Sequence, residues 1–253
     1  MALRQILGQI RHADLDYSLI QKNDRIAVGV SGGKDSLLLL YALEQYRRLK
    51  QRYDQQDFSV VGIHLGMGFP DMDFSGVATF MEKAGIEYHE YPTRIYDILQ
   101  LYPDKDGRIE CSRCSTLKKG AMVRAAKEYG CNKTAFAHHA DDAIETLFMN
   151  LTYGGRAATF QPAMHLSNTG MDFIRPLVYS FEAEIRSTAE TLGLPIVQST
   201  CPNDGFTKRQ ETKELLARIY QQYPPAHENF LRALSNQEQL RLWVKGRNWQ
   251  QEK

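Results

Sequence analysis

The stretch that most constrains this chain is RIAVGVSGGKDSLLLLYAL, which runs from Arg25 to Leu43. Its apolar start predicts a buried strand, and its leucine-rich end predicts an apolar helix. The polar turn between them carries a Gly-Gly pair that lets backbone N–H groups point at an anion, and the following helix presents its positive end there. Lys34 adds a positive charge, and Ser31 and Ser36 add hydroxyl groups. The turn therefore predicts a phosphate-binding loop directly after a strand.

This loop departs from the common nucleotide-triphosphate loop, G-x-x-x-x-G-K-S/T, at two of its positions. Val28 stands where the first glycine would be, and Asp35 stands where the magnesium-binding hydroxyl would be. A carboxylate next to a phosphate is repelled unless a cation lies between them, so Asp35 predicts a bridging Mg²⁺. The alternative is a plain Gly-Gly turn with a solvated Lys34–Asp35 pair. The position of the loop at a strand end favours the phosphate site.

Strand-like and helix-like segments alternate along most of the chain. The strands are expected at Arg25–Val30, Phe58–Leu65, Glu87–Tyr91, Lys133–His138, Ile174–Leu177 and Ile196–Ser199. The helices are expected at Lys34–Lys50, Ser75–Ala84, Cys111–Tyr129, Asp141–Tyr153 and Glu182–Leu192. This rhythm predicts an α/β fold with an open, mostly parallel sheet and helices on both faces. Residues 153–171 resemble an irregular loop or a hairpin.

The end of the chain predicts a separate helical part. From Thr207 onward the pattern is helical, with a break at Pro224-Pro225. We therefore expect residues 1–206 to form the main domain and residues 207–253 to form a helical C-terminal extension.

A second polar segment, AHHADDAIET at residues 137–146, also follows a predicted strand. Ligands of open α/β sheets bind beyond the carboxyl ends of the strands, so this segment and the phosphate loop belong to one edge. Asp141 and Asp142 open a helix, where carboxylates cap free N–H groups. Capping explains one acid, whereas two suit metal binding or general acid–base chemistry. For His138 and His139 a functional role and a satisfied core position both stay open.

The composition is that of an ordinary globular protein, with a formal net charge of +1 and no apolar run near the roughly 20 residues that span a bilayer. We expect a cytoplasmic protein without a membrane association. Binding to a nucleic acid then requires local basic patches. The candidate residues are Arg108, Arg113, Lys118, Lys119 and Arg124 in one stretch, and Lys208, Arg209 and Lys213 in another. The second group has helical spacing, so a solvated helix face is its alternative.

The chain contains four cysteines, and Cys111 and Cys114 form a C-x-x-C pair at a helix start. In a cytosolic chain this spacing favours a metal site or a redox pair over a structural disulfide. A zinc site prefers four ligands, and Cys201 is the obvious third cysteine. Cys131 is expected to be a small buried hydrophobic residue and not a ligand. Three cysteines at one edge suit a 4Fe–4S cluster in which one iron stays open and can hold a sulfide.

The order of these motifs resembles a known family. SGGKDS after the first strand is the motif of the PP-loop ATP pyrophosphatases, and AHHADDAIET is similar to the G-H-x-x-D-D-x-x-E-T pattern of their sulfur-transferring members, with Ala137 in place of glycine. With CSRCSTLKKG, FIRPL, LPIVQSTCP and KRQ, the chain resembles the tRNA 2-thiocytidine biosynthesis (TtcA) family, related to the TtuA 2-thiouridine synthetases. Many TtcA proteins have a second C-x-x-C where this chain has only Cys201.

The resemblance implies an adenine nucleotide alpha-hydrolase-like fold and an ATP-dependent tRNA sulfurtransferase that uses Mg²⁺ and a 4Fe–4S cluster. The implied ATP-binding residues are Ser31, Gly32, Gly33, Lys34, Asp35, Ser36, Ala137 and Asp142. The implied cluster ligands are Cys111, Cys114 and Cys201. Lys118 matches a catalytic basic residue of the TtuA relatives, and Asp142 matches their acidic residue; Asp35 acts with them through the metal.

On this reading a pyrimidine C2 oxygen is adenylated, and sulfur then replaces AMP. The expected partners are tRNA and a sulfur donor, which is either a cysteine desulfurase or free sulfide. The residues expected to contact the tRNA phosphates are Arg113, Lys119, Lys208, Arg209 and Lys213. A homodimer is compatible with the sequence. Two alternatives stay open: a PP-loop sulfurtransferase or desulfidase for another thionucleoside or a small molecule, and an ATP- and metal-binding module without turnover.

Overall fold

The computed structural model describes residues 2–69, 72–103, 109–201 and 208–236 of the chain. The strands of these residues are β1 (Arg25–Val30), β2 (Ser59–Gly66), β3 (Glu87–Pro92), β4 (Lys133–Ala135), β5 (Ala163–Leu166) and β6 (Met171–Ile174). Their helices are α1 (Ala2–Tyr17), α2 (Lys34–Tyr53), α3 (Ser75–Ala84), α4 (Ile95–Leu101), α5 (Cys111–Glu128), α6 (Ala140–Gly154), α7 (Glu182–Thr191), α8 (Lys208–Gln222) and α9 (Ala226–Ser235).

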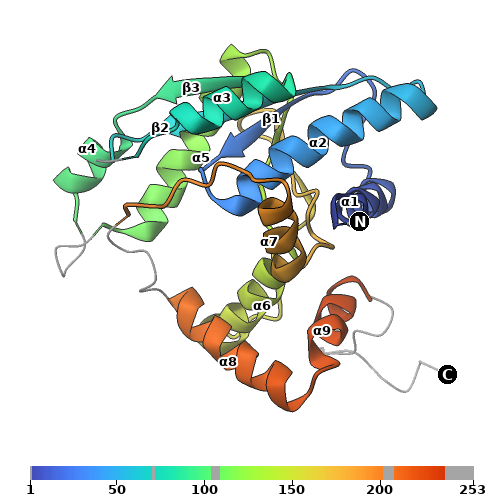
Figure 1. Ribbon diagram of the computed structural model, residues 1–253. Helices are drawn as coiled ribbons and strands as arrows, with labels where there is room; N and C mark the ends of the chain where they lie inside the picture. The colour runs from blue at the N-terminus through green and yellow to red at the C-terminus, as the bar shows by residue number, and fades with distance from the viewer. Residues whose placement is uncertain (1, 70–71, 104–108, 202–207, 237–253) are drawn as a thin grey trace.

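The described strands form one sheet in the order β3-β2-β1-β4-β6-β5. All neighbouring pairs are parallel except the hairpin of β5 and β6 at one edge. The chain leaves β1 for β2 and β3 on one side and returns to β4 on the other side (Figure 1). The strand order therefore reverses beside β1, and open α/β sheets bind their ligands beyond the strand ends at such a point.

Both faces of the sheet are covered by helices, as the sequence predicts. Ile26, Val28 and Val30 of β1 point into a core that includes buried residues of α1, α2, α3 and α7. Ala27 points to the opposite face, where α5 supplies Met122 and its neighbours. This alternation follows from the two-residue period of a strand, and it makes β1 apolar on both sides.

Helix α2 holds the phosphate loop against this core. Leu37, Leu38, Leu39, Leu40 and Leu43 are all completely buried. A helix that is apolar around its whole circumference has to be surrounded, and here α1, α7 and the sheet surround it. The start of α2, and with it the loop before it, is therefore fixed by packing on all sides.

Two strand predictions were wrong. The predicted strand Ile174–Leu177 shares only Ile174 with β6, because Pro176 lacks the N–H group of a ladder and the chain turns there. Residues 196–199 form no strand; their link to the strand end is one backbone hydrogen bond, in which Val197 N donates to the Gly32 carbonyl at 3.0 Å. The predicted strand Lys133–His138 is shorter and ends at Ala135.

The helical C-terminal part is confirmed within the described residues. Helix α8 ends before Pro224-Pro225 and α9 begins after it. The boundary expected between residues 206 and 207 lies outside the described residues, so the division into two domains stays a prediction. Helices α8 and α9 pack on α6 and lie below the sheet in the view of Figure 1.

Candidate active site

The phosphate loop joins β1 to α2 in a tight turn that its own serines stabilise. The Ser36 hydroxyl accepts a hydrogen bond from Ser31 N at 3.1 Å and donates one to the Gly33 carbonyl at 3.0 Å. Gly33 is the N-cap of α2, and its residue type provides no capping side chain. The first N–H groups of the helix are therefore available for an anion, as expected of a phosphate loop.

Position 32 requires a glycine because of both its backbone conformation and its close neighbours. Its φ of +89° lies in the left-handed region, and a Cβ at this position would approach Phe74 and Val197 to 3.0 Å. Val197 also donates its N–H to Gly32. The chain segment that leads to Cys201 is thus fastened directly to the phosphate loop.

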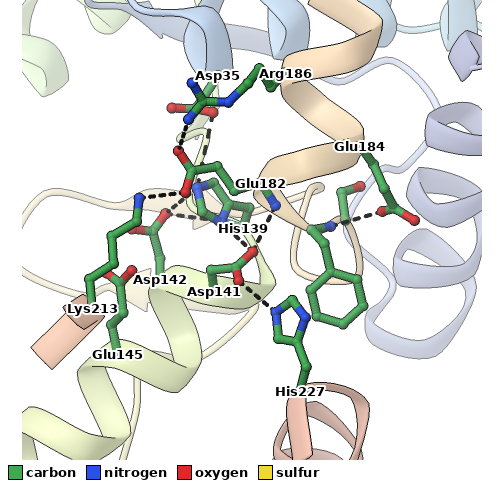
Figure 2. A network of polar contacts seen from close by, with 12 residues as sticks. Asp35, His139, Asp141, Asp142, Glu145, Glu182, Glu184, Arg186, Lys213 and His227 are labelled. Carbon is green, nitrogen blue, oxygen red and sulfur yellow. Dashed lines mark hydrogen bonds and ion pairs between the residues drawn. The ribbon is translucent and has the colours of Figure 1, made fainter. Parts of the chain in front are cut away.

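The predicted acids of the two loops converge on one imidazole. His139 Nε2 lies 4.0 Å from Asp35 Oδ1 and 3.5 Å from Asp142 Oδ2 (Figure 2). His139 is buried, and Asp35 Oδ1 is a buried oxygen that accepts no hydrogen bond, although the Lys34 ammonium lies 3.2 Å from it. Two carboxylates from separate loops beside a phosphate site fit the preference of Mg²⁺ for one or two carboxylates plus phosphates. Asp35 and Asp142 are the residues that would hold such an ion.

The structure separates the roles of the two adjacent acids. Asp142 accepts a hydrogen bond from His139 N at 3.1 Å and so caps α6 while its side chain faces Asp35 across His139. Asp141 lies on the other nitrogen of the same ring, 3.6 Å from His139 Nδ1, and accepts hydrogen bonds from Glu182 N and from His227 Nε2, both at 2.7 Å. Burial alone would raise the pKa of Asp141, but these two donors outweigh it and lower the pKa. Asp141 therefore links α6 to α7 and α9.

Lys34 is held by two carboxylates. Its ammonium lies 3.2 Å from Asp35 Oδ1 and 3.0 Å from Glu182 Oε1. Burial disfavours the charged amine, but the two acids outweigh burial and raise the pKa of Lys34. The lysine therefore stays charged beside the phosphate loop. Glu182 was not predicted, because it lies far from both loop motifs in the sequence and follows no recognisable pattern.

Of the three basic residues on α8 that were expected on the tRNA, Arg209 and Lys213 pair with acids of this site while remaining partly exposed. Arg209 Nη1 lies 2.9 Å from Asp142 Oδ1 and 3.0 Å from Glu145 Oε2. Lys213 forms an ion pair with Glu182 Oε2. Lys208 is exposed and pairs with Glu211 of its own helix at 3.1 Å. Helix α8 thus brings two cations to the acidic groups of the two loops.

The three predicted cluster cysteines are brought together at the start of α5. The Cys114 thiol is buried and interacts electrostatically with Cys111, Cys201 and Lys118. Burial raises the pKa of Cys114, and the nearby Lys118 opposes this effect. None of the four cysteines, all of which lie in the described residues, forms a disulfide. Three thiols that influence one another in this way fit an iron–sulfur cluster, whose separate irons are each held by a cysteine thiolate.

Cys131 lies elsewhere, in the core between the sheet and α5, as expected of a structural residue. Burial raises the pKa of this thiol to about 11. Within the described part of the chain, no three His, Cys, Asp or Glu side chains surround a single point as the ligands of one metal ion do. This is compatible with a cluster, because its thiolates bind separate irons.

The remaining basic candidates lie on or before α5. Arg113 pairs with Glu110 at 3.3 Å and stacks over the Tyr102 ring at 5.2 Å. Lys118, Lys119 and Arg124 are exposed. Arg108 lies outside the described residues. Their role in tRNA binding stays a prediction.

The buried Arg175 guanidinium acts electrostatically on His138, which precedes His139 in the second loop. Arg175 is buried, its guanidinium stacks over Phe160 at 4.9 Å, and its Nε has no hydrogen-bond partner. Burial lowers the pKa of Arg175. Burial, together with the charges of Arg175 and Arg209, also lowers the pKa of His138 to about 4, although Asp142 opposes the shift. His138 is therefore a neutral imidazole at pH 7.

This shift predicts a measurable pH dependence of stability. The unfolded chain binds a proton at His138 near pH 6.5, whereas the folded chain resists it down to about pH 4. The folded state therefore has its full stability with respect to His138 above pH 6.5, where this imidazole is neutral in both states. It loses free energy of unfolding as the pH falls toward 4, because only the unfolded chain gains the proton. We expect the free energy of unfolding of the wild type to fall by about 2 kcal/mol more than that of His138→Gln over this range, measured by urea denaturation. Parallel pH profiles would contradict the burial of His138 as a neutral group.

The comparisons with known proteins identify the family of this chain. A family model described as a PP-loop domain matches residues 4–210. A protein from Pelobacter propionicus named tRNA-cytidine(32) 2-sulfurtransferase is 38% identical over 235 residues, 92% of this chain and 86% of that protein. A protein of the same name from Geobacter metallireducens is 37% identical over 236 residues, 92% of this chain and 90% of its own length.

The fold has a counterpart among solved structures. The U34-tRNA thiolase NcsA from Methanococcus maripaludis, solved with its 4Fe–4S cluster, superimposes with a TM-score of 0.72 over 96% of this chain and 81% of that one. At 23% identity this likeness concerns the fold alone. None of the described helices has the length and apolar composition to cross a membrane. The chain belongs to the tRNA 2-thiocytidine biosynthesis (TtcA) family of PP-loop proteins.

Proposed function

We propose that this protein is an ATP-dependent tRNA sulfurtransferase that converts a cytidine of tRNA to 2-thiocytidine. Its relatives carry the name tRNA-cytidine(32) 2-sulfurtransferase, which specifies the base and its position in those proteins. The observation that carries the proposal is the short chain segment between the phosphate loop and the cysteines. Val197 is bonded to Gly32, and Cys201 follows four residues later.

This segment limits the distance between the two sites. Four extended residues span at most about 14 Å, so Cys201 cannot lie farther than this from the residue bonded to the phosphate loop. Cys201 in turn interacts with Cys114 at the start of α5. A nucleotide on the loop and a sulfur at the cysteines could therefore reach the same base.

The proposed reaction has two stages. In the first stage the C2 oxygen of the pyrimidine attacks the α-phosphate of ATP, and pyrophosphate leaves. The loop N–H groups and Lys34 bind the phosphates, and Asp35 and Asp142 hold Mg²⁺. In the second stage sulfur bonds to C2 and AMP leaves, while the charge of Lys118 stabilises the developing negative charge on phosphate. Asp142 alternatively accepts or donates a proton at the base.

Cys111, Cys114 and Cys201 would hold a 4Fe–4S cluster in this scheme. When bound, a cluster with three protein ligands supplies an iron at which an external sulfur atom can reside. The sulfur donor is either a cysteine desulfurase or free sulfide. The exposed Lys119 and Lys208 remain candidates for contacts to the tRNA phosphates.

The test is nucleoside mass spectrometry of unmodified tRNA after incubation with ATP, Mg²⁺, sulfide and anaerobically reconstituted protein. We expect 2-thiocytidine and stoichiometric pyrophosphate, and neither product without ATP. Thiolated uridine instead of cytidine would show that the base is wrong. ATP turnover with a small thiol acceptor and no modified tRNA would favour the small-molecule alternative, and nucleotide binding without turnover would favour the binding module.

A further inference from the structure

The Glu182 carboxylate is shared by three cations from different parts of the chain. Its Oε1 lies 3.0 Å from Lys34 of the phosphate loop and 3.0 Å from Arg186, one turn along α7. Its Oε2 pairs with Lys213 of α8. Figure 2 shows this carboxylate between the phosphate loop and the C-terminal helices. The side chain is 17% exposed, and its partners lower the pKa of Glu182 to about 2, so it is ionised.

ATP binding changes the partners of this carboxylate. The inference rests on the proposed function, in which Lys34 turns to the phosphates. Glu182 then loses one of its cations although it stays largely buried, and an unpaired buried charge is costly. Lys213 still faces the other oxygen of the same carboxylate. When Lys34 leaves, Arg186 remains on the same oxygen and Lys213 remains on the other, and Lys213 is the partner that α8 contributes.

We propose that Glu182 and Lys213 are positioning residues of the ATP site. Glu182 holds Lys34 beside the loop while no nucleotide is bound, and Lys213 neutralises Glu182 once Lys34 has moved to the phosphates. Helix α8 is then part of the nucleotide site, and Lys213 acts there and not on tRNA. Because coupling is reciprocal, ATP binding strengthens the hold of Glu182 on Lys213 and fastens α8.

The local charge balance supports this assignment. A triphosphate that enters the site approaches five carboxylates, those of Asp35, Asp141, Asp142, Glu145 and Glu182. Helix α8 supplies two cations to this group, Arg209 on Asp142 and Glu145, and Lys213 on Glu182. Burial raises the pKa of Glu145, and the charges of Arg209 and Lys213 oppose this shift. Without α8 the acids of the site would repel the nucleotide.

The test is the affinity for α,β-methylene ATP with Mg²⁺, measured by calorimetry in the absence of tRNA. We expect Lys213→Met to weaken binding roughly 3- to 10-fold, the range of one partly buried ion pair. The matched control is Arg218→Met, which removes an exposed cation of the same helix that forms no ion pair within the described residues. We expect this control to bind the analogue like the wild type.

A double-mutant cycle separates a role through Glu182 from general attraction to ATP. In a Glu182→Gln background the ion-pair partner of Lys213 is gone and only its smaller effect on Glu145 remains, so Lys213→Met should change the affinity less than 2-fold there, about the limit of additivity. An equal loss in both backgrounds would overturn the proposal. Amide exchange in residues 208–222 should also slow when the analogue binds to wild type, and not when it binds to Glu182→Gln.

Failure of this inference is distinguishable from failure of the proposed function. A wild type that does not bind the analogue would contradict both. A wild type that binds it, with Lys213→Met equal to wild type, would contradict only the role of Lys213. A normal affinity of Lys213→Met for ATP together with weakened tRNA binding would return Lys213 to the tRNA surface.

Discussion

Replacing Asp35 with alanine is expected to abolish pyrophosphate release while the fold remains intact. Asp35 Oδ1 is a buried oxygen that accepts no hydrogen bond, 3.2 Å from the Lys34 ammonium and 4.0 Å from the imidazole that also faces Asp142. In the proposed site this oxygen binds Mg²⁺, and loss of an electrostatic group at a transferring phosphate costs about 10²- to 10³-fold in rate. The measurement is tRNA-dependent pyrophosphate release at saturating ATP.

The control for this change is Asp97→Ala, which removes an exposed carboxylate that pairs only with Arg94 within the described residues. We expect it to release pyrophosphate at the wild-type rate and to unfold at the same temperature as Asp35→Ala. Asp35→Ala protein that turned over normally would rule out the metal role. Lys34→Ala should instead weaken ATP binding, because its charge acts on phosphates already present in the ground state.

The part of the fold that sequence reasoning predicted is the part in which local pattern and burial agree. Strand β1 and helix α2 were predicted because an apolar run ends at a glycine turn and continues as a leucine-rich helix. Residues 196–199, which were wrongly predicted to form a strand, also begin with two apolar β-branched residues, Ile196 and Val197. It lies beyond the strand ends, where Val197 makes one bond to Gly32 and finds no neighbouring ladder. Whether such a segment forms a strand depends on its position in the tertiary structure, and the periodicity of the sequence carries no information about that position.

In the active site, too, local motifs could be predicted and residues brought in by tertiary packing could not. Asp35 and Asp142 could be found because each belongs to a contiguous motif after a strand, and parallel strands end at one edge. His139 had an obvious place but an open role, which its burial between the two acids now explains. Glu182 and His227 come from α7 and α9, and no local spacing connects them with the loops. Only the packing of α7, α8 and α9 around the end of the sheet brings them in.

The largest expected effect outside the phosphate loop concerns the three cysteines around Cys114. Changing Cys111, Cys114 or Cys201 to serine should lower the iron bound on anaerobic reconstitution below about four per chain and abolish thiolation. The reason is that Cys111, Cys201 and Lys118 lie close enough to the Cys114 thiol to act on its pKa. A cluster that loses one of three protein ligands no longer holds its remaining irons in one defined position. Iron and acid-labile sulfide, together with the modified nucleoside, are the quantities to measure.

Cys131→Ser is the matched control, because it makes the same chemical change in a residue of the same chain. Cys131 is buried in the core, and the raised pKa of its thiol, about 11, keeps it protonated and uncharged. We expect this variant to bind iron and thiolate tRNA like the wild type, with a loss of about 1 kcal/mol in stability from placing a hydroxyl in the core. Equal loss of iron in Cys131→Ser would mean that four cysteines ligate or that another trio does. Cys131 follows the C-terminal end of α5, whereas Cys111 and Cys114 lie at its start. Ligation by Cys131 would therefore require the chain to rearrange around the cluster. The far-ultraviolet circular dichroism spectra of the apo and reconstituted proteins would then differ.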